Sequence, residues 1–209
     1  MYKKLLLVEP ELFLNSNTAL VGSSSTLVNS KYGSKIDSFQ SVVRFNRAVT
    51  KKFEKSVGSK TTLRVVNNHV FDNQDIAHQG YTNSPKNFVK KLKNQNILYV
   101  GPHMGPWDRR EKNTHSSNNL YKFQYSKIDK IKKVLNINQK ENLQIGTIMI
   151  GICLLSGIKP NLFGFDIEDI PRTHYYQSRP ETEDYVNHNP SNERKAIRVL
   201  VENKMIHLN

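Results

Sequence analysis

The sequence contains a single cysteine, and this scarcity limits both its covalent and its metal chemistry. One cysteine, Cys153, excludes a disulfide within the chain and is typical of a protein that works in a reducing compartment. The seven histidines show no H-x3-H spacing, and a C-x2-C pair is absent. Because zinc sites commonly use such spacings, we expect no metal cofactor.

Long apolar runs are missing as well. Before Glu9 and Pro10 the chain has four consecutive apolar residues, Leu5–Val8, which is too few for the core of a signal peptide. The most apolar stretch, Ile145–Leu155, contains two glycines and is too short to span a bilayer. We therefore expect a cytoplasmic protein, which could lie against the anionic inner face of a membrane through its lysines.

Acidic residues are few, because 18 Asp and Glu stand against 31 Lys and Arg and leave a formal net charge of +13. Such a surface suits an anionic partner: nucleic acid, lipid headgroups, or an anionic sugar nucleotide with a polyanionic glycan acceptor. Abundant lysine on solvated faces explains the same charge without any partner. No arginine-rich tract or basic strip interleaved with aromatic residues is present. Nucleic acid is therefore not the expected partner, although a basic nucleic-acid-binding protein stays an alternative.

Apolar runs bounded by turn residues alternate with segments of helical periodicity. The predicted strands are Lys4–Val8, Ala19–Val21, Ser41–Phe45, Thr61–Val66, Asn96–Val100 and Asn161–Phe165. Helical spacing occurs in Ser84–Asn94, Ser126–Val134 and Gln144–Ser156, and Gly101–Leu120 reads as a long loop, a candidate lid for an acceptor site. This alternation predicts an α/β fold in which residues 1–209 form a single Rossmann-like domain, with a mainly parallel twisted sheet flanked by helices.

Two polar loops follow predicted strands. Ala19–Val21 runs into Gly22-Ser23-Ser24-Ser25, and Ser41–Phe45 ends at Asn46. A Gly/Ser turn at the mouth of a helix presents backbone N–H groups and hydroxyls, which suits a phosphate, although many such turns exist for steric reasons alone. Because parallel sheets bind ligands beyond the carboxyl ends of their strands, both loops are candidates for one binding site.

Polar residues also precede the last predicted helix. Asn189 is a good N-cap and Pro190 a good first residue, and the helix would bury the face formed by Ile197, Leu200 and Val201. His188 then lies just before the helix, and Glu193, about one turn in, could reach back toward it. A carboxylate near an imidazole fixes its orientation, as a general base requires. A capped helix with an incidental histidine explains the same residues.

The stretch Ala19–Ala48, ALVGSSSTLVNSKYGSKIDSFQSVVRFNRA, resembles the large sialylmotif of the eukaryotic-type sialyltransferases. Three later segments follow in the family's order. Gly146–Phe165 resembles the small sialylmotif, His174-Tyr175-Tyr176-Gln177 resembles the third motif, and the H-x4-E from His188 to Glu193 resembles the very short motif. Together they cover most of residues 18–200. Because the sequence lacks both the family's bridging cysteines and an apolar anchor, it is similar to a soluble microbial or viral member of that family.

The resemblance implies a variant GT-A type sialyltransferase fold and an inverting, metal-independent glycosyltransferase. Such an enzyme moves a nonulosonic acid, sialic acid or a relative such as Kdo, from its CMP-activated form to a hydroxyl of a glycan or lipid-linked saccharide, as in polysaccharide biosynthesis. The resemblance implies His188 as general base, oriented by Glu193, and His174 as a donor to the leaving phosphate or as an assisting acid. The residues implied at the nucleotide and donor sugar are Gly22, Ser23, Ser24, Asn46, Gly146, Thr147, Gly164, Phe165 and Tyr175.

Three departures from the family pattern bear on this reading. Ser23 stands where the family usually has asparagine, and Leu143-Gln144-Ile145 replaces the Pro-Ser-Thr before Gly146. Thr18 and Gly157 stand where secretory-pathway members have bridging cysteines. Like those members, this sequence has no D-x-D metal-binding signature. A degenerate transferase that binds CMP or a glycan without turnover is therefore a further alternative.

Overall fold

The computed structural model describes residues 6–7, 9–67, 70, 91–101, 117–168, 174–176 and 190–209. The predicted helix Ser84–Asn94 falls largely outside these ranges, as does most of the predicted loop Gly101–Leu120.

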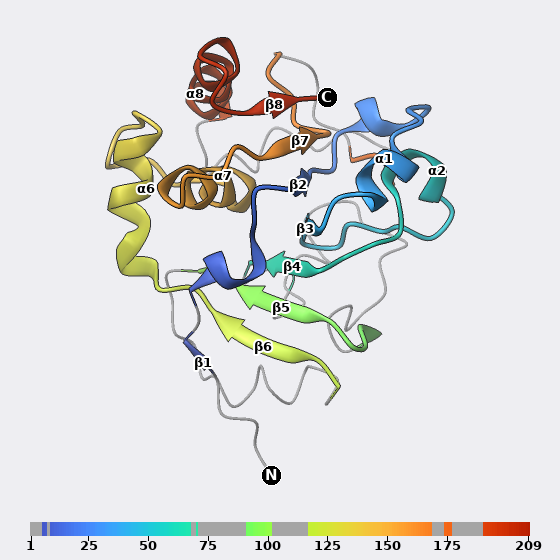
Figure 1. The fold of residues 1–209 in the computed structure, drawn as a ribbon. Helices are drawn as coiled ribbons and strands as arrows, with labels where there is room; N and C mark the ends of the chain where they lie inside the picture. Colours follow the sequence, from blue (N-terminus) through green and yellow to red (C-terminus); the bar gives the residue numbers. More distant parts are fainter. Residues whose placement is uncertain are drawn as a thin grey trace.

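One parallel sheet organises the described part of the chain (Figure 1). Its eight strands lie in the order β1-β6-β5-β4-β3-β2-β7-β8, and every neighbouring pair is parallel. The strands are β1 (Leu6–Leu7), β2 (Thr18–Val21), β3 (Ser41–Phe45), β4 (Leu63–Val66), β5 (Asn96–Tyr99), β6 (Asn119–Lys122), β7 (Asn161–Phe163) and β8 (His207–Leu208). The expected α/β fold with a parallel sheet is confirmed.

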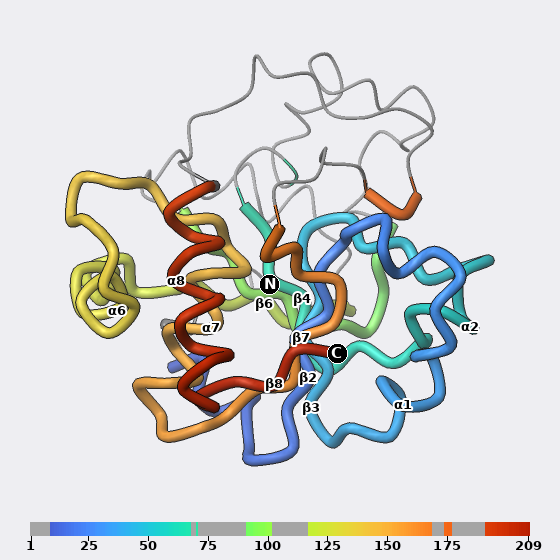
Figure 2. The backbone as a smooth tube through the Cα atoms, turned by 90° about the horizontal axis from the view of Figure 1, so that it is seen from above, coloured from blue at the N-terminus to red at the C-terminus, as the bar shows by residue number. Residues whose placement is uncertain are grey.

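Helices cover both faces of the sheet, as a parallel sheet requires (Figure 2). On one side lie the short helices α1 (Gly33–Asp37) and α2 (Glu54–Val57), and on the other lie α6 (Ile128–Val134), α7 (Ile145–Leu155) and α8 (Pro190–Glu202). Single turns of 3-10 helix are η1 (Pro10–Phe13), η2 (Ser25–Leu27) and η4 (Tyr125–Lys127). The helices predicted over Ser126–Val134, over Gln144–Ser156 and after Asn189 are confirmed to within two residues where they are described.

The central strands alternate their side chains between two apolar clusters. Leu20 and Val43 belong to the cluster that α6, α7 and α8 complete, whereas Ala19 and Val42 belong to the one that α1 and α2 complete. All residues of β2, β3 and β4 are buried, because both faces of the sheet are covered. The buried helix expected from the apolar stretch before Ser156 is also confirmed, since Thr147–Cys153 is buried throughout.

The strand order reverses between β2 and β7. From β2 the chain proceeds through β3, β4, β5 and β6 toward one edge, and then returns to place β7 on the other side of β2. Open parallel sheets bind ligands in the crevice at such a switch point, beyond the carboxyl ends of the strands. The loops that begin at Gly22 and at Gly164 leave the sheet there.

Two strands are absent from the sequence prediction. β6 begins inside the stretch predicted as a loop. The sequence did not indicate a strand there because its residues are exposed or half-buried and form no continuous apolar run. β8 has two residues at the edge of the sheet, where it pairs with β7 alone. The prediction of a loop as far as Leu120 is therefore wrong at its carboxyl end.

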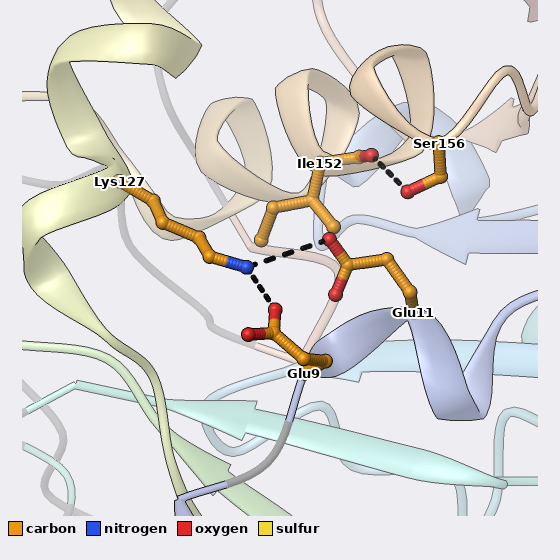
Figure 3. A network of polar contacts seen from close by, with 5 residues as sticks. All are labelled: Glu9, Glu11, Lys127, Ile152 and Ser156. Carbon is orange, nitrogen blue, oxygen red and sulfur yellow. Dashed lines mark hydrogen bonds and ion pairs between the residues drawn. The ribbon is translucent and has the colours of Figure 1, made fainter.

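A polar network ties η1 to η4 on the α6 side of the sheet (Figure 3). Lys127 donates a hydrogen bond to Glu9, and its Nζ lies 3.9 Å from Oε1 of Glu11. Nearby, the Ser156 hydroxyl donates to the Ile152 carbonyl at 2.8 Å and closes the end of α7. Because Glu9 and Lys127 are partly exposed, this ion pair contributes about 0–1 kcal/mol to stability.

Cys153 lies on α7 and is fully buried in the core. Burial raises the pKa of its thiol to about 12. Among the described residues, no helix is both long and apolar enough to cross a membrane.

Candidate active site

The loops after β2 and β7 touch through two glycines. A side chain on Gly22 would meet the carbonyl oxygen of Gly164 at 2.2 Å. Gly164 has φ +65°, and a side chain there would meet Leu27 at 2.4 Å. Both positions therefore require glycine, the first for close approach of two backbones and the second also for its left-handed conformation.

The same contact pairs two of the four backbone N–H groups that the Gly/Ser loop is predicted to present, those of Gly22 and Ser24. The N–H of Gly22 donates to the Phe163 carbonyl at 2.7 Å, and the N–H of Ser24 donates to the Gly164 carbonyl at 3.2 Å. Ser24 is buried, and its hydroxyl oxygen accepts from the backbone N–H and hydroxyl of Thr26. The loop therefore continues the pairing of β2 with β7, because the two segments lie side by side. Its Ser24 side chain caps the single turn η2.

Ser23 joins this loop to the third motif. Its hydroxyl lies 2.7 Å from Nδ1 of His174, and its carbonyl accepts a hydrogen bond from the Tyr175 N–H at 2.9 Å. Ser24 and His174 also form an isolated antiparallel bridge. Segments that lie about 150 residues apart in the sequence are thus held together at the switch point, as the motif reading predicts.

The two residues after His174 hold it from the other side. Its ring stacks on Tyr176, with centroids 5.2 Å apart and planes 19° apart. Tyr175 is buried, and its hydroxyl donates to the Val49 carbonyl at 2.6 Å. Burial raises the pKa of Tyr175 to about 12, so its hydroxyl is a neutral donor across the physiological range. His174 is itself only half-buried, so its ring is oriented by neighbours and still reaches the surface.

Asn46 directly follows β3 and is half-buried. It has φ +47°, its N–H donates to the Val65 carbonyl at 2.8 Å, and its Oδ1 accepts from the Asn67 N–H at 3.1 Å. Its Nδ2 has no hydrogen-bond partner within the described ranges. The side chain is therefore oriented through its oxygen and retains an amide donor for a ligand.

Phe165, the last residue of the small motif, packs between the loop after β2 and the first turn of α7. Its ring meets Phe45 edge to face, with centroids 6.0 Å apart. A methyl group added to Gly22 or Gly146 would approach this ring to 3.2 or 3.0 Å. The first turn of α7 and the loop after β2 are therefore spaced by one aromatic ring. The predicted role of Phe165 and Gly164 in shaping a nucleotide pocket is consistent with this position.

Glu193 connects α8 to the start of α7. The carboxylate is 3% exposed and accepts hydrogen bonds from the Gln144 N–H at 3.1 Å and from the Thr147 hydroxyl. A carboxylate at this place satisfies donors that the beginning of a helix leaves unpaired and interacts favourably with its dipole. The hydroxyl of Thr147, predicted at the donor carboxylate, is thus engaged with Glu193, whereas Gly146 beside it is half-buried.

His188 and Gln177 lie outside the described residues, and so does any contact between His188 and Glu193. The general-base assignment stays a prediction. Among the residues that the structure describes, no group of three or more His, Cys, Asp or Glu is placed to hold a metal ion.

Three buried arginines lie on β3, just after β3 and on β4, and sequence reasoning attached no role to them: Arg44, Arg47 and Arg64. Arg44 and Arg64 are register partners on neighbouring strands. Burial and the nearby Arg44 lower the pKa of Arg64 to about 10, so it is still charged at neutral pH. A charged residue within the apolar run of β4 was the available signal for Arg64.

Comparisons with known proteins identify the family and the fold. The sequence model of Glycosyltransferase family 29 (sialyltransferase) matches residues 15–205. The chain therefore belongs to glycosyltransferase family 29, the sialyltransferase family. A crystal structure of a mammalian sialyltransferase in complex with Gal-beta-1-3GalNAc-ortho-nitrophenol has the same fold, with a TM-score of 0.62 and 19% identity over 92% of this chain and 68% of that chain.

Matches to curated relatives are shorter. Beta-galactoside alpha-2,6-sialyltransferase 2 of Xenopus tropicalis is 47% identical over 58 residues, which are 28% of this chain and 11% of the frog protein. Beta-1,6-galactosyltransferase GALT29A of Arabidopsis thaliana is 50% identical over 52 residues, 25% of this chain and 13% of the plant protein. These matched stretches therefore span little more than a tenth of either relative.

Proposed function

We propose that this protein is an inverting glycosyltransferase that moves a nonulosonic acid from its CMP-activated form to a hydroxyl of a glycan or lipid-linked saccharide. The observation that carries the proposal is the Ser23–His174 contact of 2.7 Å at the switch point of the sheet. It joins the first and third family motifs in the crevice where parallel sheets bind ligands. Family membership supports glycosyl transfer as the reaction class.

In the proposed reaction, the acceptor oxygen forms a bond to the anomeric carbon while the bond from that carbon to the CMP phosphate breaks. His188 takes the acceptor proton, and the bonding pair leaves with CMP. Ser23 and the amide of Asn46 bind the phosphate and ribose, and His174 donates to the phosphate as its charge grows. Donors held in place before the reaction act on developing charge without reorganising. Residues that fix His174 from two sides support this role.

The position of Thr147 bears on how the donor sugar would be recognised. The Thr147 hydroxyl donates to Glu193. The start of α7 would therefore offer backbone N–H groups, and not this hydroxyl, to the carboxylate of the donor sugar. This arrangement also supports the second candidate, a protein that binds CMP without turnover. The name of the Arabidopsis relative, a galactosyltransferase, adds UDP-galactose to the donors that must be compared.

A donor screen tests the proposal. Nucleotide release is measured from CMP-N-acetylneuraminate, CMP-Kdo and UDP-galactose, each with and without β-galactoside or lipid-linked acceptors and without added metal. We expect CMP release that depends on acceptor and survives EDTA. CMP binding without release from any donor would favour the second candidate, and acceptor-dependent use of UDP-galactose alone would replace the CMP donor. Absence of CMP binding at millimolar concentration would refute the proposal.

A further inference from the structure

The segment Asn46–Val49, which follows β3, has a backbone that most residues avoid. Asn46 has φ +47° and Ala48 has φ +21°, both in the range that L-residues rarely adopt. Such conformations persist when the surrounding structure holds them, and they concentrate at functional sites. The contacts around this segment are therefore informative.

Arg64 holds the segment from the sheet. Its side chain is 3% exposed, and its Nη1 donates to the carbonyls of Asn46 at 2.7 Å and of Arg47 at 3.2 Å. Its Nε donates to Oε1 of Gln95 at 2.9 Å, which fixes the direction of the guanidinium. One buried cation thus binds two consecutive carbonyls of the segment.

Two further residues complete what we name the clamp, formed by Arg64, Asn67 and Tyr175. The Asn67 N–H donates to the side chain of Asn46, and the Tyr175 hydroxyl donates to the Val49 carbonyl. The three come from β4, from the residue after it, and from the third motif. They bind the segment at both ends.

We propose that Arg64 is a positioning residue that holds Asn46 in its ligand-binding orientation before the nucleotide arrives. This inference rests on the proposed function, in which Asn46 binds CMP. When a binding-competent conformation is populated only in part, the apparent dissociation constant rises by the inverse of that fraction. Loss of Arg64 should therefore weaken donor binding although its side chain is buried beneath the segment.

Arg44 provides a matched control. It is the register partner of Arg64 on β3, it is fully buried, and it donates to the carbonyls of Val57 and Lys60. Those carbonyls lie at the end of α2 and in the loop after it, not in Asn46–Val49. Replacing either arginine removes a buried guanidinium from the same layer of the sheet, but only Arg64 donates hydrogen bonds to carbonyls of Asn46–Val49.

The experiment compares Arg64→Met, Arg64→Lys and Arg44→Met. CMP affinity is measured by calorimetry, amide hydrogen exchange is measured in peptides covering residues 46–52, and thermal unfolding monitors stability. For Arg64→Met we expect faster exchange in that peptide and a dissociation constant about tenfold higher. For Arg64→Lys, the exchange rate and the dissociation constant should lie between those of Arg64→Met and wild type. Arg44→Met should lower the unfolding temperature but change the dissociation constant less than about twofold.

A gentler pair of variants applies if Arg64→Met does not fold. Tyr175→Phe removes the single hydroxyl that binds Val49, and Tyr32→Phe removes a hydroxyl that has no hydrogen-bond partner in the described part of the chain. The first should raise exchange in residues 46–52 and weaken CMP binding, and the second should do neither.

The outcomes separate this inference from the proposed function. Equal CMP affinities for Arg64→Met and Arg44→Met would overturn the positioning role, as would unchanged exchange in residues 46–52. If wild-type protein bound no CMP, the proposed function and this inference would both fail. Where the donor is turned over, a raised donor KM with unchanged kcat would support positioning, and a fall in kcat alone would contradict it.

Discussion

Two groups of loops meet at the carboxyl edge of the sheet, and their polar residues are arranged differently. Around β2, β3 and the third motif, Ser23 contacts His174, Tyr175 donates to the Val49 carbonyl in the segment that begins at Asn46, and Ser23, Asn46 and His174 are still half-buried. At the start of α7 and α8, Glu193 and Thr147 are each 3% exposed and face each other. The first group keeps its polar side chains partly accessible to solvent, whereas the second uses them to join two helices. Polar residues at the same edge of the sheet therefore differ in how far they are open to a ligand.

The largest expected effect tests whether the α8 side also supplies chemistry. We expect His188→Ala to lower turnover by about 100-fold or more, because a well-placed base contributes about 10²–10⁴-fold. CMP affinity should stay unchanged, because the base contacts the acceptor. Steady-state kinetics and calorimetry measure the two quantities. His207→Ala, an exposed histidine on β8, is the control, and near-normal turnover of His188→Ala would remove the base assignment.

Glu193 tests the structural half of the comparison. We expect Glu193→Ala to lower the free energy of unfolding by about 3 kcal/mol, because the Gln144 N–H and Thr147 hydroxyl lose a buried charged acceptor. Glu193→Gln keeps an acceptor oxygen and should lose about half as much. Urea unfolding measures both, with exposed Glu202→Ala as control. A stable Glu193→Ala protein with much lower activity would instead make this carboxylate functional.

Ser23 tests the ligand-binding half. Ser23→Ala should weaken CMP binding about fivefold, the effect of one ordinary hydrogen bond, and leave stability nearly unchanged because the side chain is half-buried. Ser23→Asn, which installs the residue usual in the family, should retain binding. Ser25→Ala, in the same loop, is the control for calorimetry. Equal affinities for Ser23→Ala and wild type would mean that His174 needs no fixed partner.

The smallest effect compares Glu193 with a carboxylate near the surface. Burial raises the pKa of Asp37, but hydrogen bonds from Ser59 and from the Lys60 N–H outweigh it, so the folded pKa lies below the ordinary 3.8. The stability that Asp37 contributes is therefore present above pH 3.8 and is lost as the pH falls through the lower folded pKa. Asp37→Asn should cost about 1 kcal/mol at pH 7, because solvent weakens the bonds, and little near pH 2. Urea unfolding at pH 7 and near pH 2 measures the loss of stability, and an equal loss at the two pH values would contradict the prediction.

The sequence predicted the layered fold well and the local contacts of the site poorly. Apolar runs such as Val42–Phe45 identify buried strands because both faces of a parallel sheet are covered. The pairing of the Gly22 N–H with Phe163 depends on the register of strands that lie about 140 residues apart, and composition carries no register. Likewise, the hydrogen bonds of Glu193 to Gln144 and Thr147 follow from how two helices pack, which the sequence does not show, and its predicted contact with His188 stays a prediction. The family motifs predict that Ser23 and His174 lie in one site, and the two side chains are in contact.

The burial of Cys153 has a practical consequence for testing the nucleotide loop. The thiolate is the reactive form of cysteine, and with a pKa of about 12 and a fully covered side chain this thiol stays inert toward maleimides in the folded protein. A cysteine introduced at the exposed Val28, just after η2, would therefore be the one site that a fluorophore labels. Fluorescence from a label at position 28 would therefore report on the loop after β2 without removal of the natural cysteine.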